Sequence, residues 1–87
     1  MAEISRFYGI IIQMFGNDHN PPHFHVIFNK YRAIFAIESG KLLQGRIPLQ
    51  QMKIVQAWTY IHKVELLENF KCLRSEIQTF KKIKPLE

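Results

Sequence analysis

Glycine and proline are distributed unevenly along this chain, and that distribution constrains the fold more than any other feature of the sequence. All four glycines lie at or before Gly45, whereas neither residue type occurs between Pro48 and Pro85. Proline suits the first turn of a helix, and both residues are unfavourable in a helix interior. We therefore expect short strands before Pro48 and a helical region over about residues 48–77.

Four runs of apolar and β-branched residues precede Pro48, and turn residues separate them. The runs cover residues 7–15, 24–28, 32–38 and 41–47. Short connections between short strands favour an antiparallel meander. The sequence therefore predicts one α+β domain over residues 1–87. It consists of a small antiparallel sheet of three to four strands (about 7–47), one long bent helix or two C-terminal helices packed on the sheet, and a basic tail (78–87).

Two apolar stripes with helical spacing follow Pro48. The first consists of Ile54, Ala57, Trp58 and Ile61, and the second of Leu66, Leu67, Phe70, Leu73 and Ile77. At about 100° per residue, the two stripes point in different directions around one helix axis. The helical region should therefore bend near residues 62–65 or present its two halves to different neighbours. If one stripe covers the sheet, the other is available to a partner, and Leu66, Leu67 and Phe70 are the candidate partner interface.

The composition is that of a small globular protein. With seven Phe, three Tyr and one Trp, an 87-residue chain can build one core, near the size at which cores become marginal. The single cysteine, Cys72, excludes an intramolecular disulfide and is expected to be buried. No signal peptide or membrane span is recognisable. We therefore expect a cytoplasmic protein with no membrane partner, of a size that is often completed by oligomerisation.

The formal net charge of the chain is +5. Charge of this sign can attract RNA, DNA or an acidic protein, although basic side chains on a helix are often only a solvated surface. Arg32, Arg46 and Lys53 are the candidate nucleic-acid-binding residues.

Three of the four histidines fall between Asp18 and His25, and two consecutive prolines lie among them. The prolines hold the backbone extended and position the flanking side chains at low entropic cost. His23 and His25 are two residues apart at the start of an expected strand. Both side chains should therefore lie on one face of the strand, opposite Phe24. His19 precedes them in a loop that can fold over that face.

This segment has three interpretations, and its candidate metal ligands and candidate catalytic residues are the same side chains: His19, His23, His25 and Asp18. Imidazole suits divalent transition metals such as Zn or Ni, which favours a metal site. Histidine also titrates near neutrality, which favours acid–base cleavage of RNA or another phosphoester, with Arg32 or Arg46 holding the phosphate. In the third interpretation the segment is a rigid loop whose side chains only satisfy backbone groups.

Several motifs together resemble a known family. They are the sequence Ile-Ser-Arg-Phe at residues 4–7, the segment 17–25, the pair Trp58 and His62, and the ending from Lys81. In this order they resemble the small bacterial family called domain of unknown function 4160, over essentially the whole chain. The family has no established activity. Its members are often encoded beside another small protein, in pairs commonly suspected of being toxin–antitoxin modules, so the resemblance implies a small protein partner.

Two hypotheses of different classes remain. In the first, the protein is one component of a toxin–antitoxin-like pair and acts through contacts with a protein partner, or a second copy, and with nucleic acid. In the alternative, it is itself a ribonuclease or phosphoesterase toxin that uses the histidine segment, with or without a metal. The residues leave open whether the protein is an enzyme.

Overall fold

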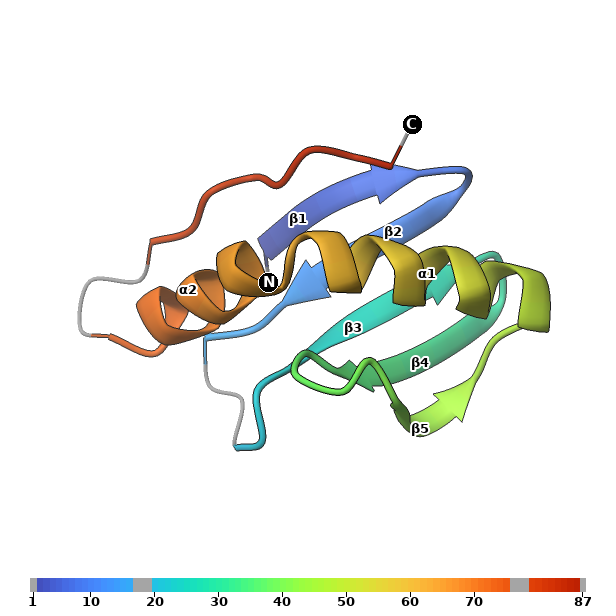
Figure 1. Cartoon of the computed structure of the whole chain (residues 1–87), viewed down its shortest axis with the longest axis horizontal. Coiled ribbons are helices and arrows are strands. Elements are labelled where there is room, and N and C mark those ends of the chain that lie inside the picture. The colour runs from blue at the N-terminus through green and yellow to red at the C-terminus, as the bar shows by residue number, and fades with distance from the viewer. Residues whose placement is uncertain (1, 17–19, 76–78, 87) are drawn as a thin grey trace.

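The structure, a computed structural model of the chain, describes residues 2–16, 20–75 and 79–86. Five strands form one antiparallel sheet in the order β1-β2-β3-β4-β5, and two helices follow (Figure 1). The elements are β1 (Ala2–Phe7), β2 (Ile10–Met14), β3 (His23–Phe28), β4 (Tyr31–Ala36), β5 (Leu42–Arg46), α1 (Leu49–Ile61) and α2 (Lys63–Leu73). The predicted α+β class and antiparallel meander are confirmed, with five strands in place of three to four.

The additional strand is β1, which lies before the first predicted run (7–15) except for Phe7, and the run itself forms β2. A tight turn at Tyr8 and Gly9 separates β1 from β2, and the two residues have φ values of 50° and 75°. Positive φ at both central positions is the pattern of a type I′ hairpin turn, which glycine adopts without steric cost. The apolar sequence continues through the turn, so the hydrophobic pattern alone does not reveal it.

The core lies between one face of the sheet and the two helices, which cover that face (Figure 1). The strands direct a set of buried apolar side chains to this side: Ile10, Ile12, Met14, Phe24, Val26, Ala33 and Phe35. Trp58 of α1 is fully buried, and its ring centroid lies 5.2 Å from that of Phe7 and 6.0 Å from that of Phe24. Trp58 therefore joins α1 to both the edge and the centre of the sheet.

The helical region breaks at His62, which ends α1 and precedes α2. The His62 ring lies 5.5 Å from the Trp58 ring, and its Nδ1 is 2.6 Å from Oε1 of Glu65. The predicted bend near residues 62–65 is confirmed. Because the axis changes direction there, residues from both stripes can face the same core.

Four residues of the second apolar stripe, Leu66, Leu67, Phe70 and Leu73, pack into the core, and Ile77 lies outside the described residues. Leu66 and Phe70 are buried, and Leu67 packs against the same core. This placement does not fit an exposed partner interface at Leu66 and Phe70, because side chains already covered by the sheet offer no surface to another molecule. Part of the first stripe faces outward instead, since Ile61 is 60% exposed.

Residues 79–86, which belong to the predicted basic tail, run beside β1 (Figure 1) and are held to the core. Ile83 is buried, and its N–H donates to the carbonyl oxygen of Ile4 at 2.9 Å. The side chain of Asn69 donates to the carbonyl oxygen of Lys81 at 2.7 Å and accepts from its N–H at 2.8 Å. This C-terminal segment therefore covers the outer edge of β1.

Two further expectations concern Cys72 and the membrane. Cys72 is exposed, so the prediction that it is buried is wrong. Within the described residues, neither helix has the length and apolar character that crossing a bilayer requires.

Candidate nucleic-acid interface

The open face of the sheet is the side that points away from α1 and α2. Its side chains form rows that cross neighbouring strands. We call the row through His25 the central row, and it consists of Glu3, Gln13, His25, Ile34 and Gln44. We call the row through Arg32 the lower row, and it consists of Arg6, Ile11, Ile27, Arg32 and Arg46. Residues directly opposite each other on neighbouring strands have Cβ atoms about 4.5–5.5 Å apart. Each row is therefore a continuous line of side chains across the sheet.

His23 and His25 lie side by side at the start of β3, with ring centroids 5.5 Å apart. The prediction that they share one face, opposite the buried Phe24, is confirmed. Nδ1 of His23 is 2.7 Å from the carbonyl oxygen of Pro21. A carbonyl oxygen only accepts, so Nδ1 must carry the proton of this bond. The bond to Pro21 therefore sets the orientation of the His23 ring.

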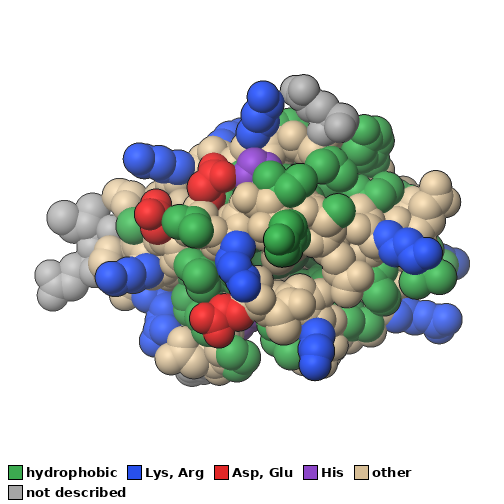
Figure 2. Space-filling model, in the orientation of Figure 1, with side chains coloured by type: hydrophobic (Ala, Val, Ile, Leu, Met, Phe, Trp, Pro, Cys, Tyr) green, Lys and Arg blue, Asp and Glu red, His purple; other side chains and the backbone are tan. Residues whose placement is uncertain are grey.

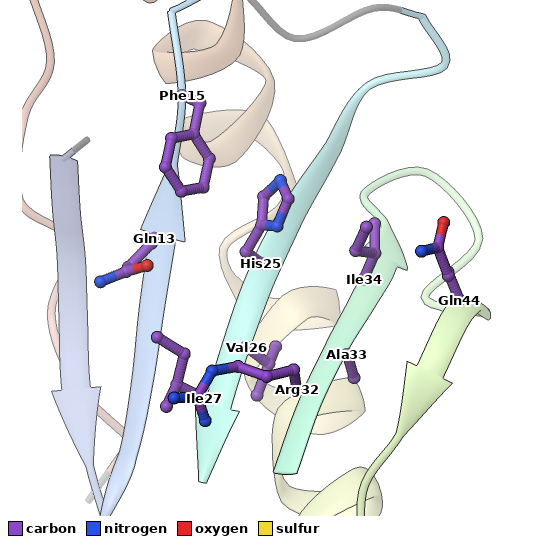
Figure 3. Close-up of a pocket in the computed structure, with 9 residues that line it drawn as sticks. All are labelled: Gln13, Phe15, His25, Val26, Ile27, Arg32, Ala33, Ile34 and Gln44. Atoms are coloured by element: carbon purple, nitrogen blue, oxygen red, sulfur yellow. The ribbon is translucent and has the colours of Figure 1, made fainter. Parts of the chain in front are cut away.

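Two hollows lie along the open face and meet at the central row. The first, of about 270 Å³, is lined by residues that include Gln13, Phe15, His25 and Arg32 (Figure 3). The Phe15 ring stands edge-on to His25, with centroids 4.5 Å apart. The second hollow, of about 260 Å³, extends from His25 to His23 and Pro21. Together they form a shallow surface of rings and aliphatic side chains.

Arg32 and Arg46 are directly opposite each other on β4 and β5, and both are exposed. Nη1 of Arg32 donates to the carbonyl oxygens of Asn29 and Tyr31, at 3.0 Å each. Gly45 has a φ of +84°, and a Cβ atom at this position would lie 2.2 Å from the carbonyl oxygen of Arg32. Only glycine allows β5 to approach β4 this closely, and this approach belongs to the pairing in which Arg32 is opposite Arg46.

Lys53 is exposed on α1, in the layer on the other side of the sheet. The structure therefore brings Arg32 and Arg46 together and separates Lys53 from them.

Acidic side chains are distributed unequally between the two sides of the molecule. Of the four that the structure describes, Glu65 and Glu68 are on α2, and Glu38 lines a hollow against α1. The helical face shows both signs of charge (Figure 2). On the open face the one described carboxylate is Glu3, which pairs with Arg6 at 2.7 Å. The hydrogen bond from Arg6, aided by the charges of Arg6 and Lys82, lowers the pKa of Glu3.

Two sets of contacts from the end of α2 support the histidine segment, and the local sequence predicts neither of them. Nη1 of Arg74 donates to Oδ1 of Asn20 at 3.0 Å, which ties the end of α2 to a residue 54 positions earlier. The Arg74 guanidinium lies 5.4 Å from the centre of the Phe70 ring, and that ring is 5.7 Å from His23. The Asn20–Pro21 peptide bond is cis, whereas trans is the ordinary state. The end of α2 thus helps to position His23.

His19 and Asp18, the other candidate catalytic and metal-binding residues, lie outside the described residues. Within the described ranges, no three His, Cys, Asp or Glu side chains are grouped closely enough to hold a metal ion. The candidate zinc or nickel site therefore stays a prediction that needs His19.

The comparisons with known proteins identify a family whose function is unknown. A family model described as a domain of unknown function, DUF4160, matches residues 9–71 of the chain. No curated protein and no solved structure matches it. The matched residues include most of the open face and both helices up to Lys71.

Proposed function

We propose that this chain, which belongs to the DUF4160 family of domains of unknown function, binds single-stranded RNA on the open face of its sheet. The observation that carries the proposal is the pair Arg32 and Arg46. Like charges directly opposite each other on neighbouring strands destabilise a sheet. Among the described residues, neither guanidinium group has a carboxylate partner. A phosphate group between them would offset the repulsion, and guanidinium groups bind phosphate in a bidentate manner.

The hollows next to this pair suit nucleobases. Phe15, His25 and His23 present rings, and Ile34 presents an aliphatic surface. Stacking of a base on a ring contributes about 1–3 kcal/mol and tolerates any base. Bases are accessible in this way only in single strands, because a duplex covers their flat surfaces. The open face therefore favours a single strand over a duplex.

RNA is preferred to DNA because polar side chains stand among the rings. The amides of Gln13 and Gln44 line the first hollow, on either side of His25. An amide both donates and accepts hydrogen bonds, and so does the ribose 2′-hydroxyl group. A deoxyribose strand would leave these bonds unmade.

The proposal is tested by fluorescence anisotropy with a labelled eight-nucleotide U tract, the matching DNA strand and a blunt RNA duplex. Arg32→Gln and Arg46→Gln should each weaken binding of the single strand, and each should reduce the salt dependence of log K by about 0.7. The control, Lys53→Gln, removes the same charge from the helical face and should change neither value. Equal losses in all three variants would show only a general effect of net charge and would contradict the proposal.

A second candidate function, cleavage of the bound strand, is favoured by the histidine pair. One imidazole can take a proton from a ribose 2′-hydroxyl group while a second donates a proton to the departing 5′ oxygen. The ring centroids of His23 and His25 are 5.5 Å apart, and the bond from Nδ1 to the carbonyl oxygen of Pro21 orients the His23 ring beside His25. The products should carry a 2′,3′-cyclic phosphate.

Cleavage is tested with His23→Asn and His25→Asn on an RNA strand and on a strand with a single 2′-deoxy position. Loss of cleavage in both variants, with binding by anisotropy retained, supports the histidine pair as the acid and base. Full cleavage by either variant, or cleavage at the 2′-deoxy position, would exclude it. If the unmodified protein binds RNA and leaves it intact, the open face is a binding surface alone.

The protein partner implied by the family resemblance is also part of the proposal. RNA binding is compatible with either component of a toxin–antitoxin-like pair, as the active member or as its regulator. Expression of the chain in a bacterial host with and without the small protein encoded beside it tests this. Growth inhibition that requires Arg32 and Arg46, and that the neighbouring protein relieves, assigns the chain as the toxin.

A further inference from the structure

We infer that a bound single strand crosses the open face from β5 to β1, with its phosphates along the lower row and its bases on the central row, and ends at a second basic site formed by Arg6 and Lys82. This inference rests on the proposed RNA binding and specifies its path and length.

The lower row has arginines at both ends. Arg6 is opposite Ile11, Ile11 is opposite Ile27, Ile27 is opposite Arg32, and Arg32 is opposite Arg46. Strands are about 4.8 Å apart, so five strands separate the outer two by roughly 19 Å. Stacked nucleotides repeat at about 3.4 Å per strand, so this distance accommodates at most about six stacked nucleotides and fewer extended ones.

The two rows are spaced suitably for a backbone and its bases. Successive side chains of a strand point to opposite faces of the sheet. Neighbouring rows on one face are therefore two residues, or about 6.6 Å, apart along each strand. On β3 this places Ile27 in the lower row and His25 in the central row. A strand whose phosphates follow the lower row can therefore direct its bases toward His25 and the first hollow.

The C-terminal segment supplies the second basic site at the outer edge of β1. A hollow of about 330 Å³ at this edge is lined by side chains that include Glu3, Arg6, Lys82 and Lys84. The buried Ile83 between the two lysines anchors the segment to Ile4. The two ends of the lower row are thus both basic, although the sequence separates Lys82 from Arg46 by 36 positions.

Nε1 of Trp58 donates to the carbonyl oxygen of Lys84 at 3.0 Å, which adds a second anchor from α1. Both anchors use backbone atoms of the segment. The charged ends of its lysine side chains take no part in them, so a substitution at Lys82 can change binding while the anchors stay in place.

Glu3 limits how much of the positive charge at the second basic site is available to bind a ligand. Its carboxylate holds Arg6 through bonds of 2.7 and 3.3 Å, and both side chains are at the surface. A phosphate group that reaches Arg6 must compete with this carboxylate. Removing the Glu3 charge should therefore strengthen binding of a long strand, whereas removing Arg6 should weaken it.

The test measures anisotropy for U tracts of two, four, six and eight nucleotides at constant ionic strength. For the unmodified protein, affinity should rise with length up to about six nucleotides. Arg6→Gln and Lys82→Gln should each lower the affinity for the six-nucleotide tract about threefold and leave the two-nucleotide tract unchanged. Glu3→Gln should raise the affinity for the six-nucleotide tract. Lys53→Gln should change neither the affinity for the two-nucleotide tract nor that for the six-nucleotide tract.

The outcomes separate the path from the function. If Arg32→Gln and Arg46→Gln weaken binding while Arg6→Gln and Lys82→Gln do not weaken it and Glu3→Gln does not strengthen it, the path across the sheet is wrong and the proposed function stands. If none of the five variants changes the affinity, both are wrong. Equal effects of Arg6→Gln on the short and the long tract would also overturn the inference.

Discussion

The open face and the helical face of this molecule both expose apolar side chains, but they differ in charge. Tyr60, Ile61 and Val64 of the two helices are exposed. The helical face also shows basic and acidic side chains among the hydrophobic ones (Figure 2). On the open face, half-buried isoleucines lie between arginines, and the one described carboxylate is already paired with Arg6. The comparison shows that both faces expose apolar groups and that they differ in charge, and it is this difference that supports the proposed RNA binding on the open face.

The two sides of the sheet also differ in their contribution to stability. The side under the helices holds the large buried rings, while the open face holds few side chains that the fold needs. Substitutions on the two sides should therefore separate folding from binding, and the following expectations test that separation in order of decreasing effect.

Trp58→Ala should cause the largest loss of stability, about 3–5 kcal/mol, because it removes the ring that contacts Phe7 and Phe24 in the core. Urea unfolding followed by circular dichroism measures this. The matched control on the open face is Phe15→Ala, which should cost much less stability and should weaken RNA binding. Comparable losses of stability for the two variants would remove the distinction between the faces.

Asn69→Asp should destabilise the chain by about 1–3 kcal/mol, because the carboxylate keeps the acceptor for Lys81 N–H but loses the donor to Lys81 O. The measurement is again urea unfolding. Hydrogen exchange should show faster exchange of the Ile83 amide, which marks detachment of the C-terminal segment. An unchanged exchange rate of the Ile83 amide would show that attachment of the C-terminal segment does not depend on Asn69.

Arg46→Glu should move stability and binding in opposite directions. It replaces a like-charge pair with an opposite-charge pair opposite Arg32, which should stabilise the sheet by about 0.2–1 kcal/mol. RNA binding should fall by more than it does in Arg46→Gln. A loss of both stability and binding would instead indicate that Arg46 has a structural role.

The smallest expected effect concerns Glu3 and pH. Its pKa in the folded chain is lowered, chiefly by the hydrogen bond from Arg6, relative to the ordinary glutamate value of about 4.3. The pair therefore stabilises the fold above that value, and the contribution disappears as the pH falls through the lowered pKa. The difference in unfolding free energy between the natural chain and Glu3→Gln should be small at pH 7 and vanish once the pH falls below the lowered pKa of Glu3. A constant difference would mean that the charge pair does not cause it.

Several features of the fold and the site can be predicted from the sequence because they depend on neighbouring residues. The spacing of two positions places His23 and His25 on one face, and the absence of glycine and proline between Pro48 and Pro85 indicates helices. The bend at His62 follows from two apolar stripes that cannot share one straight axis. Each of these is a local consequence of the strand or helix repeat.

Other features depend on contacts between distant segments. The turn at Gly9 adds a strand, and the register of all four hairpins then aligns Arg6 with Arg46 across the sheet. Burial of Leu66 and Phe70, and the attachment of Ile83 to Ile4, depend on where the helices and the C-terminal segment pack. Local periodicity tells which side chains share a face of one element. Register and packing determine which faces meet, because they are set by turn geometry and by the total apolar surface that the whole chain can bury.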